Sequence, residues 1–199
     1  LRVEHQRLPL GTLVREGFAA ARNPRIALAY ASAFVARGDV VVIGMYLSLW
    51  AQRAGAETGL APDVAQSQGG LMLGIVSGGP LLIAWAFGIL NDRIDRVTAM
   101  AWAGALAGIG YLAFGSLQSP LLGIAIPVGV LLGCGQVACI IAGQTLIGQE
   151  ADPRIAGSTL GAFNAFGALG TLVGSVAGGY LFDTWTYGAP FLMMGAASL

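Results

Sequence analysis

The stretch LLGIAIPVGVLLGCGQVACIIAGQTLIGQ, residues 121–149, contains no charged side chain. A helix needs about 20 apolar residues to cross the hydrocarbon core of a bilayer. The alternative, a buried strand of an α/β domain, is about 4 to 8 residues long, so this run is several times too long for it. Because a bilayer offers no water to backbone N–H and C=O groups, a spanning run folds as a helix that satisfies them internally. The stretch therefore predicts a transmembrane helix.

The whole chain has the composition of a membrane protein. Of its 199 residues, 56% are hydrophobic and 10% are charged, and its mean hydropathy is +0.74, whereas a soluble domain carries about a quarter charged residues. The net charge is zero, which argues against a nucleic-acid partner, since that function needs a basic excess. Cys134 and Cys139 have no CxxC spacing and the single histidine, His5, is distant. We therefore expect no metal and no cofactor.

Six apolar segments follow a polar, arginine-rich stretch at residues 1–23. We expect that stretch to be a cytoplasmic amphipathic linker lying on the membrane surface. Five of the segments are long enough to span a bilayer, and the sixth, with eleven residues, is expected to be a truncated helix. The expected helices cover about residues 24–50, 66–90, 97–117, 121–149, 156–182 and 189–199.

The arginines of the connectors predict the orientation. With the N-terminus inside, Arg53 is the one arginine on the outer side of the predicted helices, and eight fall on the cytoplasmic side. Cytoplasmic loops carry the excess of basic residues, so we expect a multi-pass protein of the cell inner (plasma) membrane. The eight are Arg2, Arg7, Arg15, Arg22, Arg25, Arg93, Arg96 and Arg154.

Two short matches indicate an internal repeat. GILND at residues 88–92 and GYLFD at residues 179–183 share the form G-x-L-x-D, and each ends the second helix of a set of three. With three helices between them, the two copies fall on opposite membrane faces, as inverted repeats require. The expected fold class is all-α: a polytopic helical membrane protein with six transmembrane helices as two inverted three-helix repeats, the last helix truncated. Close helix packing is expected at the small-xxx-small positions Gly129, Gly133, Gly170, Gly174 and Gly178.

The longer stretch GILNDRIDR, residues 88–96, resembles the loop signature G-x-x-x-D-R-x-G-R of the major facilitator superfamily. Gly88, Asp92, Arg93 and Arg96 match, while Asp95 stands where the signature has glycine. This degenerate form is similar to the copy in the second half of these transporters. The resemblance implies that residues 24–199 are a C-terminal six-helix half whose partner is an N-terminal six-helix half of the same protein.

The resemblance further implies that Gly88, Asp92, Arg93 and Arg96 form a latch that closes the cytoplasmic side in one state. We expect Asp92 at a helix start, where it binds unpaired backbone N–H groups. The two arginines are able to pair with carboxylates or lipid phosphates. The alternative for the same residues is a fixed topology anchor that obeys the charge rule and never moves.

Arg37 and Asp39 lie near the middle of the first predicted helix, where a charge costs several kcal/mol unless it is paired or faces water. Two positions along a helix differ by about 200° of rotation, so the two side chains should point apart and not neutralise each other. The functional interpretation makes Asp39 a proton- or cation-coupling site and Arg37 its tuner or a contact to an anionic solute. The alternative is a pair of fixed interhelical bridges.

Two amides complete the expected pathway. Gln136 lies midway along the fourth predicted helix and Asn164 within the fifth, and either is able to contact a solute. An amide in a membrane helix equally often makes an interhelical hydrogen bond worth about 1 kcal/mol.

The predicted function is secondary active transport of a small solute by alternating access, coupled to protons. Catalysis is not expected, because serine chemistry needs a base near a buried serine and His5 lies outside every helix. An aspartyl mechanism needs two mid-membrane carboxylates, and Asp39 is alone. The alternatives left open are a non-transporting membrane scaffold or sensor, and a six-helix half acting as a homodimer.

Overall fold

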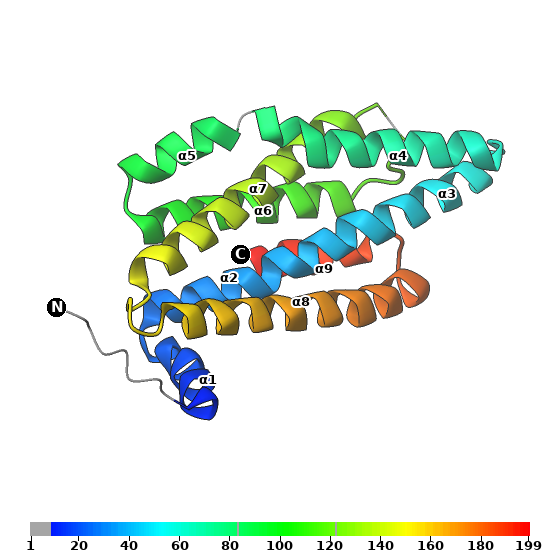
Figure 1. The fold of residues 1–199 in the computed structure, drawn as a ribbon. Coiled ribbons are helices and arrows are strands. Elements are labelled where there is room, and N and C mark those ends of the chain that lie inside the picture. The colour runs from blue at the N-terminus through cyan, green and yellow to red at the C-terminus, as the bar shows by residue number, and fades with distance from the viewer. Residues whose placement is uncertain (1–8, 83, 122) are drawn as a thin grey trace.

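The computed structural model describes residues 9–82, 84–121 and 123–199, without the side chains of Leu82, Leu90, Asn91 and Asp92. These residues form helices joined by short connectors, and the chain is a polytopic helical membrane protein (Figure 1). The helices are α1 (Leu10–Ala19), α2 (Pro24–Val41), α3 (Leu47–Glu57), α4 (Pro62–Gly78), α5 (Ala84–Arg93), α6 (Arg96–Gly115), α7 (Ala125–Glu150), α8 (Ala156–Thr184) and α9 (Ala189–Ser198).

Within the described residues, four helices are long and apolar enough to cross a membrane. They are Pro24–Glu57, Arg96–Gly115, Ala125–Glu150 and Ala156–Thr184. The first combines α2 and α3 into one continuous helix that runs seven residues past its expected end at Trp50. The apolar α9 covers ten residues and is too short to span.

Inside the first long helix, Val42–Tyr46 forms a π-helical turn that joins α2 to α3. A π turn accommodates one more residue than an α-helical turn does, and such turns are frequent at functional sites. The turn begins three residues after Asp39, so it lies next to an acidic side chain near the middle of the spanning helix Pro24–Glu57. Its last residue, Tyr46, donates a hydrogen bond of 2.5 Å to the backbone oxygen of Ser175 on α8.

The second predicted segment is not one helix, so the expectation of a continuous helix over residues 66–90 is wrong. α4 ends at Gly78, a 3-10 turn covers Gly79–Leu82, and α5 begins at Ala84. The cause is Pro80, which has no N–H to donate to the carbonyl of Val76 and whose ring clashes with a continuing helix. That carbonyl faces α7 at Gly133, where a Cβ atom would collide with it.

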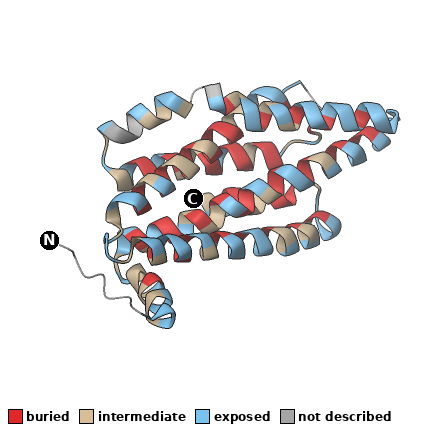
Figure 2. Cartoon of the chain, in the orientation of Figure 1, coloured by how far each residue is buried: buried red, intermediate tan, exposed pale blue. Residues whose placement is uncertain are grey.

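The helices pack as a bundle around α2, α6 and α7. α2 lies against both α8 and α7, α6 lies against α7 and α9, and α4 covers α3 and part of α7. Figure 1 shows the α5–α6 and α7–α8 connectors at the same end of the bundle as α1. We refer to this end, which the arginine distribution leads us to expect on the cytoplasmic side, as the cytoplasmic end. Burial is concentrated on the inner helices, while α8 and α4 expose long faces (Figure 2).

Glycines set the closest helix contacts, as their spacing predicts. On α8, Gly170 faces the backbone of Phe34 and Gly174 faces Gly38, so α2 and α8 meet backbone to backbone. On α7, Gly129 faces side chains of α4, so these two helices also approach closely. Small residues at such positions let helices approach where lipid provides no hydrophobic drive for association.

Candidate functional site

The two charges in the middle of α2 lie on opposite sides of the helix. Asp39 is fully buried, whereas Arg37 is exposed. Across the part of the chain that the structure describes, the one salt bridge joins Arg25 to Glu150. The prediction that Arg37 and Asp39 do not neutralise each other is therefore confirmed, and it follows from the rotation of about 100° per residue along an α-helix.

The carboxyl group of Asp39 is enclosed by neighbouring helices. Tyr111 on α6 and Cys139 on α7 lie within electrostatic reach of it, and the adjacent Gly38 packs against Met194 of α9. The Tyr111 hydroxyl lies close to the Asp39 carboxyl, but neither group makes a hydrogen bond of good geometry with a described residue. Burying an ionised carboxylate without partners costs several kcal/mol. This group is therefore suited to take up a proton or a small cation.

Arg37 lines a polar cavity on the other side of α2. The cavity has a volume of about 240 Å³ and lies between α2, α7 and α8. Its polar side chains are Ser32 and Arg37 of α2 with Cys139 and Gln144 of α7. Gln144 is exposed, and no carboxylate lines this cavity.

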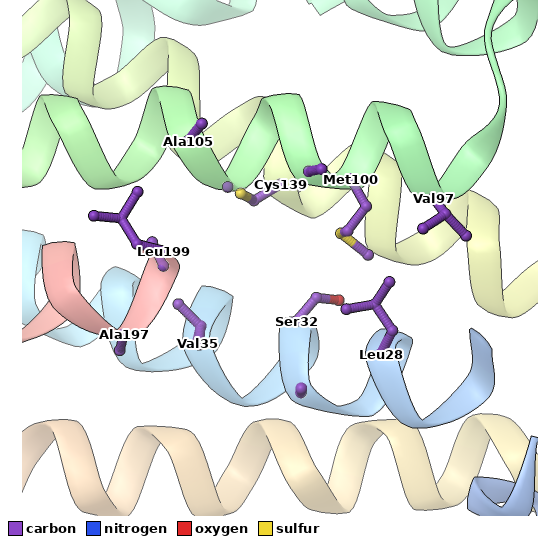
Figure 3. Close-up of a pocket in the computed structure, with 13 residues that line it drawn as sticks. Leu28, Ser32, Val35, Val97, Met100, Ala105, Cys139, Ala197 and Leu199 are labelled. Atoms are coloured by element: carbon purple, nitrogen blue, oxygen red, sulfur yellow. The ribbon is translucent and has the colours of Figure 1, made fainter. Parts of the chain in front are cut away.

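A second, apolar cavity of about 450 Å³ lies between α2, α6 and the end of α9. Figure 3 shows Leu28 of α2 facing Val97 and Met100 of α6 across it, with Leu199 at its border. The two cavities share Ser32 and Cys139. Ser32 of α2 and Cys139 of α7 therefore border both a polar and an apolar cavity.

A polar cluster ties the helices together at the cytoplasmic end. The Arg25 guanidinium lies 2.8 Å from a Glu150 carboxylate oxygen, and the Asn23 amide donates to the other oxygen at 3.3 Å. Asn23 also caps α2, because its side-chain oxygen accepts from the backbone N–H of Arg25 at 3.0 Å. The start of α2 is thus joined to the end of α7. The sequence analysis missed this pair, whose members are 125 residues apart.

The fold and its loop signature can be compared with known protein families. A model of the Major Facilitator Superfamily matches residues 26–199. The chain belongs to the major facilitator superfamily. Membership in this family of transporters agrees with the helical fold, the multi-pass topology and the loop signature.

Two kinds of curated relative show the same likeness. The magnetosome proteins MamZ of Paramagnetospirillum magneticum and of Magnetospirillum gryphiswaldense are each 29% identical over 178 residues, 89% of this chain and 28% and 27% of their own lengths. The magnetosome protein MamH of P. magneticum is 30% identical over 178 residues, 89% of this chain and 41% of its own length. The chain thus spans less than half the length of these relatives. No solved structure matches it.

The superfamily loop signature lies at the cytoplasmic end, and one expectation about it is wrong. Asp92 falls near the end of α5 and not at a helix start, and its side chain lies outside the described residues. The N-cap of α6 is instead Asp95, the residue that departs from the signature. Its carboxylate accepts from the backbone N–H groups of Val97 and Thr98 at 3.1 and 3.3 Å. An acidic residue directly before an apolar helix is the signal that could have identified it.

The remaining signature residues differ in their surroundings. The Arg96 Nε donates to the Gln149 side-chain oxygen at 2.8 Å, which joins the start of α6 to the end of α7. Arg93 is exposed at the end of α5. Gly88 is half-buried, with open space where its side chain would be.

The predicted amides are not brought to either cavity. Gln136 is buried within α7 and lines neither the polar nor the apolar cavity. Asn164 is exposed on α8, where its amide donates to the Leu160 backbone oxygen of the same helix at 3.0 Å. The polar residues that do line the site with Arg37 are Ser32, Cys139 and Gln144, which the sequence analysis did not single out.

Proposed function

We propose that this chain is a six-helix half of a secondary transporter that moves a small solute by alternating access, with Asp39 as its proton-coupling residue. The observation that carries the proposal is the carboxyl group of Asp39, which is fully buried in the middle of a spanning helix and makes no hydrogen bond of good geometry with the described residues. Such a group is stable there when it holds a proton, and ionises when a change of conformation lets water in. Acidic residues in transmembrane helices commonly act in proton relays.

The helix contacts support the two inverted three-helix repeats of the proposal. Taking α2–α3, α4–α5 and α6 as one set and α7, α8 and α9 as the other, each first helix packs against the second helix of the other set. Glycines make both contacts close, Gly170 on α8 against α2 and Gly129 on α7 against α4. Exchange of equivalent contacts between two sets is expected of repeats related by an axis in the membrane plane.

The proposal assigns the other predicted residues as follows. Arg37 contacts solute in the polar cavity, while Gln136 and Asn164 act along the pathway in other conformations. Gly88, Asp92, Arg93 and Arg96 form the cytoplasmic latch, and the bond from Arg96 to Gln149 of α7 supports this, because it joins the signature loop to a second helix. The partner is an N-terminal half of the same protein, which fits the small share of its relatives that the chain covers.

The test is a proton-flux measurement on the full-length protein. Purified protein is reconstituted in vesicles that contain a pH-sensitive dye. Radiolabelled sugars, amino acids, carboxylates and phosphate are added outside, and uptake of the label is followed together with proton movement. We expect one class to drive proton movement, and we expect Asp39→Asn to abolish it. Asp63→Asn is the matched control, because Asp63 is exposed in the first turn of α4.

Each outcome of this measurement is decisive. Unchanged proton movement in Asp39→Asn contradicts the coupling role. Solute uptake without proton movement supports transport but excludes proton coupling. No uptake of any class by folded protein favours the scaffold or sensor. We propose the inner membrane as its location, and fractionation of tagged protein tests this against the magnetosomes that the relatives' names mention.

A further inference from the structure

The chemistry of the polar cavity identifies a class of solute. Arg37 forms neither a hydrogen bond nor an ion pair with any residue that the structure describes, although it lies in the middle of a spanning helix. Its aliphatic stem rests on α8 at Gly167, where a Cβ atom would lie 2.7 Å from Arg37 Cγ. The missing side chain at Gly167 thus makes room for Arg37 to reach the cavity.

The remaining polar groups of the cavity add donors but no negative charge. Gln144 has no hydrogen-bond partner among the described residues, so its amide is available to a solute. Ser32 donates its hydroxyl proton to the Ala29 backbone oxygen at 2.8 Å and is already engaged. Asp39, the nearest acid along α2, is buried on the other side of the helix. The guanidinium therefore has no counter-charge in its own cavity.

We propose that the polar cavity binds a small carboxylate- or phosphate-type anion through Arg37 and Gln144. A guanidinium presents paired N–H donors that match the two oxygens of a carboxylate or phosphate. The rest of the lining includes the apolar Ile140 and Phe163, and the volume of about 240 Å³ suits a small ion. This inference rests on the proposed transport function, which it deepens by naming the solute class.

The experiment is calorimetric titration of full-length protein, purified in detergent without phospholipid, at constant ionic strength. The probes are inorganic phosphate, succinate and, as a neutral control, glycerol. We expect phosphate or succinate to bind and glycerol not to bind. We expect Arg37→Gln to weaken binding about tenfold or more, because charge-assisted paired hydrogen bonds are lost. Gln144→Leu should weaken it less, and Arg53→Gln, which changes an exposed arginine at the outer end of α3, should leave it unchanged.

The variants separate this inference from the transport function. Arg37→Lys keeps the charge and provides a second test if Arg37→Gln is poorly folded; we expect partial binding. Equal binding by the wild type and Arg37→Gln, or no anion binding by folded wild type, overturns the anion site. Binding of phosphatidic acid in nanodiscs, with no binding of free phosphate or succinate, also overturns it and indicates a lipid headgroup. Because Asp39→Asn should still bind anion while losing proton flux, failure of the anion site and failure of proton coupling give different results.

Discussion

Charged side chains are paired at the cytoplasmic end of α2 and are not paired in its middle. At the end, Arg25 is half-exposed and lies against the Glu150 carboxylate. In the middle, Asp39 is fully buried without a hydrogen-bond partner, and Arg37 faces a cavity without a counter-ion among the described residues. The charged pair at the end forms although it is partly exposed, while the two central side chains form no ion pair among the described residues. Because an unpaired charge in the middle of a spanning helix costs free energy, Arg37 and Asp39 do not stabilise the fold.

The largest expected effect comes from separating α2 from α8 near its middle while leaving the pair at its end intact. A leucine at Gly170 would drive its side chain into the backbone of Phe34, so Gly170→Leu should destabilise the fold by about 3 kcal/mol or more. Thermal unfolding of the purified protein measures this. Gly161→Leu is the control on the same helix, because a side chain there meets open space. Equal stability of the two variants would show that the α2–α8 contact does not set the position of α2.

An intermediate effect is expected at Asp39. Replacing a buried, unpartnered polar group by an apolar side chain of similar size removes a desolvation cost. Asp39→Val should therefore stabilise the protein by about 1–2 kcal/mol while abolishing proton flux. Chemical denaturation in detergent checks the stability. A loss of stability in folded protein would mean that the carboxyl has a stabilising partner, and would remove the contrast between the two regions.

The smallest effect is expected at the cytoplasmic pair. Because Arg25 is half-exposed, its pairing with Glu150 should be weak and sensitive to salt. Arg25→Gln and Glu150→Gln should each lower the unfolding temperature by on the order of a degree. The double variant should show a small coupling that disappears in high salt. A coupling larger than the change at Asp39 would reverse the comparison and make the end of α2 the critical region.

The sequence predicted the helices well because a bilayer leaves little choice. Uncharged runs of more than about 20 residues have to be helical, and α7 and α8 lie close to their expected bounds. The opposite faces of Arg37 and Asp39 followed from helix geometry alone. The break at Pro80 was also visible, as a proline after two glycines, but the length of the apolar run concealed it.

Tertiary relations could not be predicted in the same way. The Arg25–Glu150 pair joins residues 125 positions apart, and nothing local specifies it. The polar cavity needs three helices in their final positions, so Ser32 and Gln144 carried no signal of their own. The sequence analysis placed Asp92 at a helix start within the family signature and did not consider Asp95, which directly precedes the apolar helix, as its cap. The cap geometry shows that the local signal was the better guide there.

The π-helical turn at Val42–Tyr46 determines how α3 is rotated relative to α2. Such a turn is what remains when one residue is inserted into an α-helix whose two ends keep their contacts. If the same residues relaxed to regular α-helical geometry, everything beyond Tyr46 would rotate by about 100° relative to Asp39. Trp50 now lies 5.8 Å from the Phe114 ring and 5.7 Å from the Phe191 ring, centroid to centroid, and would leave both. The π turn therefore keeps Asp39 and the aromatic cluster around Trp50 in register on one helix.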